Sequence, residues 1–309
     1  KIEWTDATWN PIAGCSKVSE GCRNCYAMRD AHRAANNPNP QVAEKYEGTT
    51  KLVGTRPEWT GRINLWPNVL DAPMNWGEPH RIFVNSMSDL FHPDVPDEYI
   101  QRVFSVIARA PRHVYQILTK RPQRALLWYR EHEHFLEDWS DEKTGPWPWS
   151  CVHMGVSAED PETWQERVLL LPPMPVKVRW VACEPLLDLI PMPMIDSSMG
   201  YLDWVVVGGE SGPYDRVRPC HPDWVRRFRD VCRSREVPFA FKQWGNWLPL
   251  SYDYNGRTEG DRVYVDGRLR RVMRDEAAEV MYAYVPKSVA GRQIDGQIHE
   301  EQPEVASDG

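Results

Sequence analysis

The clearest pattern in the chain is a series of short runs rich in β-branched and aromatic residues. They lie at 81–88, 114–120, 152–158, 178–185, 203–211 and 239–244. Apolar runs of this length, with turn residues around them, are typical of buried strands. A further strand is expected within 2–11, at the start of the chain.

A second pattern lies between these runs, where apolar residues recur at helical spacing. It covers 97–110, 122–138, 161–171 and 222–236, and each of these segments begins at Asp or Pro, which helix starts prefer. Strands and helices that alternate in this way predict parallel strands joined by right-handed crossovers. We therefore expect an α/β fold, either a doubly wound sheet or a full or partial (β/α) barrel of parallel strands, and we favour the barrel.

The remaining segments complete the expected organisation. Residues 24–37 have the pattern of a first helix, and 38–80, rich in Pro, Gly, Asn and Trp, are expected to form a long insertion after it. We expect the barrel to occupy 1–248, and a C-terminal extension with a small β-hairpin, packed on the barrel, to occupy 249–309. The end of the chain is acidic and lacks a core pattern, which predicts disorder in its last residues.

Composition limits the classes of protein to consider. The chain has 309 residues, 41% hydrophobic and 26% charged, and no apolar run long enough to cross a bilayer, so we expect a soluble protein without a membrane partner. Its start lacks the features of a secretory signal, which predicts a cytoplasmic location. A net charge of -7 argues against bulk coating of nucleic acid, although arginines gather in 216–236 and 268–274, where a solvated surface is the simpler explanation.

Three of the seven cysteines are clustered, at Cys15, Cys22 and Cys25. In a reducing compartment such a cluster points to metal or redox chemistry rather than to disulfides. Gly14 and Gly21 give this short loop the backbone freedom to fold back on itself. All three thiols can therefore reach one common centre.

Two kinds of metal centre suit three clustered thiols. A structural zinc needs a fourth ligand, for which His32 on the following helix is the nearest candidate. A 4Fe-4S cluster held by three thiolates leaves one iron open, where a cofactor can bind. The loop follows the first expected strand, at the end of the sheet where polar residues gather, and this position favours a catalytic cluster. The four isolated cysteines are expected to pack in the core: Cys151, Cys183, Cys220 and Cys232.

Polar residues follow every one of the six apolar runs, as in "NSMSD", "TKR", "VSAED", "CEP", "GGES" and "KQWG". In a parallel sheet these carboxyl ends meet at one rim, where ligands bind. Gly208 and Gly209 give room for the backbone to approach a ligand closely, or form a plain turn. We therefore expect a site at this rim.

These features resemble a known superfamily. A three-cysteine loop after the first strand of an α/β barrel is the arrangement of radical S-adenosylmethionine (SAM) enzymes, and "NSMSDLFHPDVP" at 85–96 resembles a segment of their spore photoproduct lyase branch. The first cysteine gap departs from the common CxxxCxxC spacing, since it holds six residues. More closely, the chain resembles a family of phage and bacterial proteins labelled by this three-cysteine motif. The matching segments run in order from "WNPIAGCSKVSEGCRNCYA" to "AGRQIDGQIHEEQP".

The resemblance implies roles for the rim residues. The three clustered cysteines would hold a 4Fe-4S cluster, and SAM, bound at its open iron, would be cleaved to methionine and a 5'-deoxyadenosyl radical. In this superfamily, residues after the second strand commonly meet the SAM amino group, and others meet its ribose, sulfonium or carboxylate. The expected cofactor-binding residues are Ser86, Ser88, Asp89, Lys120, Ser157, Glu159, Glu184, Gly208, Gly209, Glu210 and Lys242.

The sequence thus predicts a cytoplasmic radical SAM-type enzyme, located in the bacterial host cell if phage-encoded. Its expected partners are SAM, an electron donor such as flavodoxin or ferredoxin, and a nucleic acid or nucleotide substrate that the arginine stretches would contact. The alternative is a non-enzymatic partner-docking protein whose thiols hold zinc or a structural iron-sulfur cluster. No residue is assigned to catalysis on the substrate.

Overall fold

The computed structural model describes residues 4–251, 258–259, 262–276 and 279–303. Its central element is a seven-stranded sheet in the order β1-β6-β7-β8-β9-β10-β11, with every neighbouring pair parallel. The strands are β1 (Ala7–Trp9), β6 (Arg81–Val84), β7 (Val114–Thr119), β8 (Val152–Ser157), β9 (Val178–Cys183), β10 (Trp204–Val207) and β11 (Phe239–Phe241). From β6 on, each strand pairs with the next one in the chain, so successive crossovers build the sheet.

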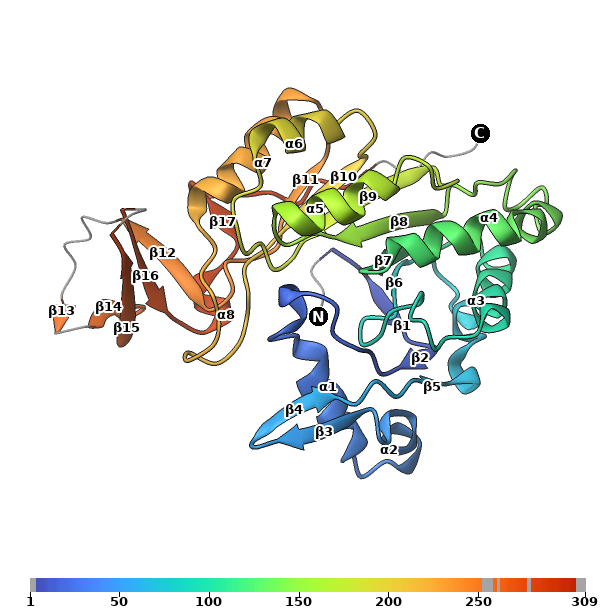
Figure 1. The fold of residues 1–309 in the computed structure, drawn as a ribbon, viewed down its shortest axis with the longest axis horizontal. Coiled ribbons are helices and arrows are strands. Elements are labelled where there is room, and N and C mark those ends of the chain that lie inside the picture. Colours follow the sequence, from blue (N-terminus) through green and yellow to red (C-terminus); the bar gives the residue numbers. More distant parts are fainter. Residues whose placement is uncertain (1–3, 252–257, 260–261, 277–278, 304–309) are drawn as a thin grey trace.

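The sheet curls into a half-barrel whose convex face is covered by the crossover helices (Figure 1). These are α3 (Asp97–Arg109), α4 (Pro122–Asp138), α5 (Pro161–Arg167), α6 (Met192–Ser198) and α7 (Pro222–Ser234). The α/β class and the partial barrel of parallel strands are therefore confirmed. The strands end earlier than their apolar runs because the last residues of each run turn into rim loops. The sequence pattern missed α6, a short helix in a segment with repeated prolines.

The two faces of the sheet are packed differently, because alternate residues of a strand point to opposite faces. Cys183 lies in the core between the sheet and the helices, as expected for a packing thiol. The concave face is filled by Trp4, Trp180 and Trp204, whose ring centroids lie 5.1 to 5.3 Å apart. Gly155 makes this possible, since a Cβ there would lie 2.3 Å from the Trp180 ring. Tryptophan packing thus closes the interior and leaves the strand-end rim for a site.

The segment between β1 and β6 carries the cysteine loop, the first helix and the expected insertion. The loop follows β2 (Ile12–Ala13) and contains a 3-10 turn, η1 (Glu20–Cys22). Helix α1 (Tyr26–Ala35) lies within the expected range. The insertion contains α2 (Pro40–Tyr46), β3 (Thr50–Val53), β4 (Arg56–Trp59), β5 (Asn64–Leu65), η2 (Pro67–Val69) and η3 (Ala72–Asn75). Strand β5 pairs with β2, which ties the insertion to the start of the cysteine loop.

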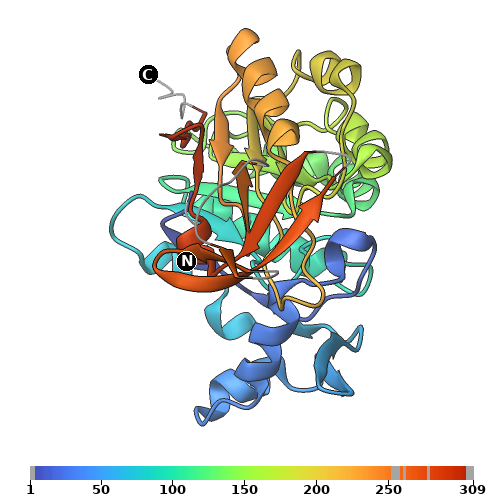
Figure 2. The same ribbon diagram turned by 90° about the vertical axis from the view of Figure 1, so that its left-hand side faces the viewer.

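The C-terminal part forms a second, antiparallel sheet beside the half-barrel (Figures 1 and 2). Its order is β12-β16-β15-β14-β13. Its strands are β12 (Trp247–Ser251), β13 (Thr258–Glu259), β14 (Arg262–Val265), β15 (Arg268–Asp275) and β16 (Val280–Tyr284). Helix α8 (Lys287–Ala290) follows, and β17 (Gln293–Ile294) and β18 (Gln297–Ile298) then form a small C-terminal hairpin, as expected. The 3-10 turn η4 (Val168–Leu170) belongs to the parallel part, where it follows α5. The expected disorder at the end falls on 304–309, outside the described residues. The division at 248 stays a prediction.

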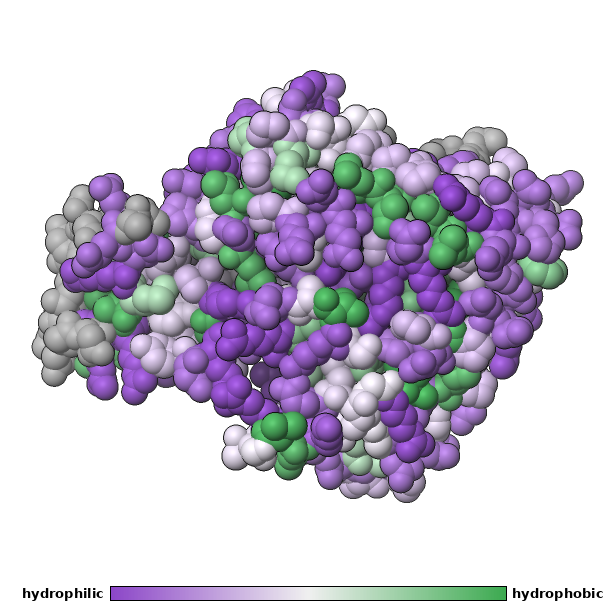
Figure 3. Space-filling model, in the orientation of Figure 1, coloured by the Kyte–Doolittle hydropathy of each residue, from purple (hydrophilic) through white to green (hydrophobic). Residues whose placement is uncertain are grey.

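The face shown in Figure 3 is mostly hydrophilic, with hydrophobic residues in small separate patches. The large hydrophobic side chains that are most exposed, Leu52 and Val53, lie at the end of β3. No helix within the described ranges is long and apolar enough to cross a membrane.

Candidate metal centre at the strand-end rim

The three clustered cysteines lie at the rim where the parallel strands end. Their thiols are free, and they are close enough for their charges to interact. Desolvation, together with negative charge on Asp89, Cys25 and Cys22, outweighs the lowering effect of Arg121 and raises the pKa of Cys15 to about 12. The loop therefore concentrates three sulfur donors in one partly buried place.

Both glycines of the loop are required by close contacts. Gly14 has a φ of +92°, and a Cβ there would lie 2.1 Å from the carbonyl oxygen of Arg62. At Gly21 a Cβ would lie 2.7 Å from Oε1 of Glu159. The expected backbone freedom is thus used at Gly14, whereas Gly21 leaves room for the Glu159 carboxylate.

Asp89, five residues after the end of β6, is buried and accepts four hydrogen bonds. Its Oδ1 accepts from the hydroxyl of Thr119 at 2.7 Å and from the backbone N–H of Phe91 at 3.0 Å. Its Oδ2 accepts from the backbone N–H of Lys120 at 3.1 Å and from Nη1 of Arg121 at 2.8 Å. The carboxylate therefore fixes the arginine that follows β7.

The side chain of Arg121 also contacts the cysteine loop. Nη2 of Arg121 donates to the backbone oxygen and to the hydroxyl of Ser16, at 3.0 and 2.8 Å, and Nη1 lies 3.9 Å from Sγ of Cys15. The buried His92 ring adds a contact of 2.7 Å from Nε2 to the same Ser16 hydroxyl. We call Asp89, Arg121 and Ser16 the first anchor.

Glu159, after β8, forms the second anchor together with Ser19 and Gly21 of the loop. Its Oε1 accepts from the Ser19 hydroxyl and, at 3.1 Å, from the Gly21 backbone N–H. Its Oε2 accepts from Nζ of Lys120 at 3.0 Å and from Nη1 of Arg167 at 3.1 Å. Burial raises the pKa of Glu159, but the charges of Lys120 and Arg167 outweigh it and hold the pKa below its usual range.

Glu210, after β10, forms the third anchor together with Arg218 and Asn24. Its Oε2 accepts from Nδ2 of Asn24 at 3.0 Å, and from the backbone N–H and Nε of Arg218 at 2.9 and 3.1 Å. Its Oε1 accepts from Nη2 of Arg218 at 2.6 Å. Arg218 also donates to the carboxylate and backbone oxygen of Glu20 in the loop, at 3.1 and 2.9 Å.

Ser86 and Ser88 hold the chain on either side of the loop. The Ser86 hydroxyl donates to Oδ1 of Asn10 at 3.1 Å, and the Ser88 hydroxyl donates to the backbone oxygen of Ile12 at 3.0 Å. The backbone oxygen of Ser86 accepts from the hydroxyl of Tyr26, which follows the last clustered cysteine, at 2.8 Å. These serines thus contact the protein's own chain, and their expected contact with SAM stays a prediction.

A separate ion pair, Lys242 with Glu184, lies at the rim after β9 and β11. Nζ of Lys242, after β11, lies 2.5 Å from Oε1 of Glu184, after β9. Gly208 lies between them, since a Cβ there would come within 3.4 Å of both side chains. Both charged groups keep some exposure, 11% for the Lys242 side chain and 19% for that of Glu184. Three of the expected cofactor-binding residues, Glu184, Lys242 and Gly208, therefore lie together here.

The two remaining expected residues, Gly209 and Ser157, contact other parts of the protein. A Cβ at Gly209 would lie 2.2 Å from the backbone oxygen of Trp244, so the neighbouring chain takes the space beside this glycine. Ser157 is buried at the end of β8, and its backbone oxygen accepts from Nη1 of Arg167 at 3.0 Å. Their expected role toward a cofactor stays a prediction.

The donors around the loop differ in how well they suit the two kinds of metal centre. Within the described ranges, no group of three His, Cys, Asp or Glu side chains is arranged to hold a single metal ion. His32 instead has Nδ1 3.3 Å from the hydroxyl of Thr50. A cubane cluster asks for a different arrangement, because each thiolate binds a different iron and the sulfurs lie farther apart than around one ion. The three free thiols are the donor type that an iron-sulfur cluster uses.

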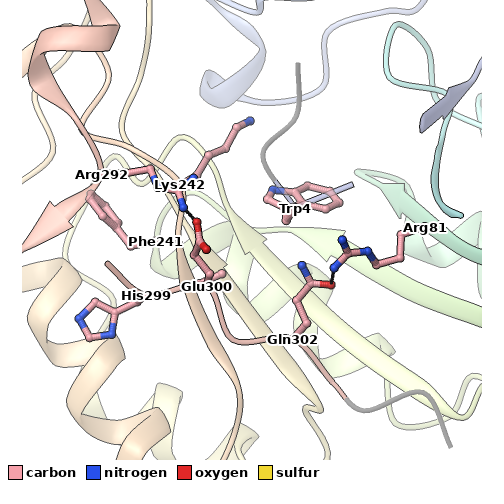
Figure 4. Close-up of a pocket in the computed structure, with 9 residues that line it drawn as sticks. Trp4, Arg81, Phe241, Lys242, Arg292, His299, Glu300 and Gln302 are labelled. Atoms are coloured by element: carbon pink, nitrogen blue, oxygen red, sulfur yellow. Dashed lines mark hydrogen bonds and ion pairs between the residues drawn. The ribbon is translucent and has the colours of Figure 1, made fainter. Parts of the chain in front are cut away.

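A pocket of about 210 Å³ lies apart from the cysteines, beside the edge strand β11 (Figure 4). It is lined by Trp4, Arg81, Ala240, Phe241, Lys242, Arg292, His299, Glu300 and Gln302. Nη1 of Arg81 donates to Oε1 of Gln302 at 2.6 Å, so the C-terminal segment bridges from β11 toward β6. Lys242 alone among the expected site residues lines it.

Sequence reasoning missed several residues that complete the anchors, including Ser19, Asn24, Arg167 and Arg218. A usable signal existed for Arg167, a charged residue within the otherwise apolar end of a helical segment. Such a residue is buried only when a carboxylate pairs with it. For the others, short polar side chains in loops carry no comparable signal.

A family model described as "Protein of unknown function (DUF5131)" matches residues 1–303. The comparison with curated proteins gives no match. Among solved structures, a spore photoproduct lyase mutant is similar at 10% identity with a TM-score of 0.40, over 91% of this chain and 69% of the other. Spore photoproduct lyase complexed with dinucleoside spore photoproduct is similar at 10% identity and a TM-score of 0.37, over 90% and 68% of the two chains.

Proposed function

The chain belongs to the family described as "Protein of unknown function (DUF5131)", and from that premise we propose that it is a radical SAM-type enzyme. Cys15, Cys22 and Cys25 hold its 4Fe-4S cluster. The observation that carries this proposal is the place of the three thiols: the protein holds them at the carboxyl rim of a parallel half-barrel, through contacts from three strand ends. A structural metal loop would not need this convergence.

The surrounding residues supply binding and orientation for SAM. Cys15, Cys22 and Cys25 would hold a cluster whose reduced form would supply one electron for the cleavage of SAM to methionine and a 5'-deoxyadenosyl radical. Glu184 and Lys242 carry opposite charges at 2.5 Å, and SAM carries an ammonium and a carboxylate at one end. This pair can exchange its internal contact for those two groups, since each ion would keep an opposite charge beside it. Gly208 leaves backbone space between them.

The proposed substrate is a nucleic acid or nucleotide. The sequence resemblance to the spore photoproduct lyase branch supports this class, and so does the C-terminal sheet. Arg262 of β14 lies directly across from Arg271 of β15, and the Arg271 guanidinium lies 4.8 Å from the ring centroid of Tyr214. Like charges placed opposite each other destabilise a strand pair unless an anion lies between them. Arginine and tyrosine together can also stack on bases.

The setting of the enzyme is part of the proposal. It works in the cytoplasm, of a bacterial host if a phage encodes it, and receives electrons from a carrier such as flavodoxin or ferredoxin. We further propose the three-cysteine phage and bacterial proteins as its relatives, and residues 1–248 and 249–309 as its barrel domain and extension.

The test is anaerobic purification followed by iron, sulfide and zinc analysis. We expect a brown protein with iron and sulfide that yields 5'-deoxyadenosine when incubated with dithionite and SAM. Cys22→Ala should remove both the cluster and this product, whereas Cys151→Ala, a buried thiol far from the loop in sequence, should keep them. A colourless protein that contains zinc would overturn the proposal and leave the non-enzymatic docking protein as the explanation.

A further inference from the structure

We infer that Asp89, Glu159 and Glu210 are positioning residues, which fix the cysteine loop before a metal is bound, rather than contacts for SAM. The inference rests on the proposed function and gives these three carboxylates a different task from the one that the sequence suggests. It follows from where they reach, how their oxygens are used and how they are spaced around the rim.

Each anchor ends on a residue directly next to one of the clustered cysteines. The first anchor reaches Ser16, the second Gly21 and the third Asn24. Every cysteine of the loop therefore has its own connection to the sheet. A loop whose position served no purpose would not need three connections with this spacing.

The carboxylate oxygens are also fully used. A carboxylate offers about four acceptor positions, and each of the three accepts four hydrogen bonds from the protein itself. The side chains of Asp89, Glu159 and Glu210 are at most 7% exposed. An ammonium group of SAM could reach one of them only by breaking an anchor.

The three carboxylates are spread around the rim because they follow alternate strands, β6, β8 and β10. Neighbouring strands lie about 4.8 Å apart, so alternate strand ends are separated by roughly 10 Å. The loop is thus held at three distant points and has little freedom to rotate. Glu184, in contrast, pairs only with Lys242 among the described residues, and neither contacts the loop there.

The experiment removes anchors one at a time and measures the thiols directly. Ser19→Ala and Asn24→Ala remove contacts on the loop side, and Glu159→Gln removes the charge of the second anchor. Ser197→Ala and Glu162→Gln are matched controls. The Ser197 hydroxyl donates within its own helix, to the backbone oxygen of Met194, and Glu162 is exposed in the first turn of α5.

Three readouts separate positioning from SAM binding. In the metal-free protein, mass spectrometry follows alkylation of each cysteine by iodoacetamide, which we expect to accelerate about tenfold near a lost anchor because the loop opens more often. In the reconstituted protein, iron should be released to a chelator about tenfold faster. The dissociation constant of SAM, measured on the cluster-loaded fraction, should stay unchanged in these variants and rise in Lys242→Ala.

The outcomes are distinct. Alkylation and iron release at the rates of the controls would overturn the inference, and so would normal iron retention with a raised SAM dissociation constant. If Glu159→Gln fails to fold, Ser19→Ala still tests the same anchor with the carboxylate intact. If the unaltered protein binds no iron, the proposed function fails, while alkylation of the metal-free protein still decides whether the loop is held in place.

Discussion

Replacing Gly14 by alanine tests how tightly the fold constrains the cysteine loop. Two separate penalties can be worked out for this substitution. The backbone has a φ of +92°, and a non-glycine residue held in such a region costs about 1–3 kcal/mol. The new Cβ would also lie 2.1 Å from the backbone oxygen of Arg62, and overpacking of this kind adds about 1–3 kcal/mol. Together we expect a loss of about 2–6 kcal/mol in the free energy of unfolding.

Gly61→Ala is the matched control, because it isolates the first penalty. Gly61 has nearly the same φ, +91°, but nothing lies within 4 Å of a Cβ built there. Its substitution should cost only the backbone term, about 1–3 kcal/mol. The difference between the two variants therefore measures the contact with Arg62.

Urea denaturation followed by circular dichroism gives the free energy of unfolding of each variant, and iron content after reconstitution reports on the loop. We expect Gly14→Ala to lose more stability than Gly61→Ala and to retain little iron, whereas Gly61→Ala should load normally. Equal losses of stability in the two variants would show that the Arg62 backbone moves away freely. The reasoning about a rigidly held loop would then be wrong.

Three further predictions follow from other parts of the structure. Gly155→Ala should lose about 1–3 kcal/mol of stability through overpacking, because its Cβ would lie 2.3 Å from the Trp180 ring, and a double-mutant cycle with Trp180→Phe should show the loss partly relieved; simple additivity would contradict this. Hydrogen bonds from Arg81 lower the pKa of Asp6 to about 2, so this stabilisation is present above the ordinary carboxylate pKa and disappears as the pH falls toward 2. The free energy of unfolding of Asp6→Asn, measured by urea denaturation at several pH values, should be lower than that of the unaltered protein near neutrality by an amount typical of an exposed pair, about 0.2–1 kcal/mol, and the two should converge in acid. Cys183→Ala should keep its iron, since this thiol lies among the helices on the convex side; loss of iron on elemental analysis would refute that placement.

Local patterns in the sequence determined much of the fold. Buried strands and amphipathic helices have recognisable patterns among neighbouring residues, so the parallel half-barrel, the starts of β6 to β11 within one residue, and the starts of α3, α4, α5 and α7 could be predicted. The cysteine loop and the glycines in it were recognisable for the same reason, as was the gathering of polar residues at the strand ends. The short helix α6 was missed, and the C-terminal extension was predicted only as a hairpin without its further strands, because these segments carry weak or mixed patterns.

The tertiary structure alone decided how the rim residues are used. A carboxylate takes whichever donors the fold brings within about 3 Å, and the partners of Glu159 lie far from it in the chain, at Ser19, Lys120 and Arg167. No local pattern could show that its acceptor positions are filled by the protein, or that Glu184 pairs with Lys242. The sequence by itself therefore identified which residues stand at the rim, and only the packing of distant segments showed which of them contact the cysteine loop and which pair elsewhere.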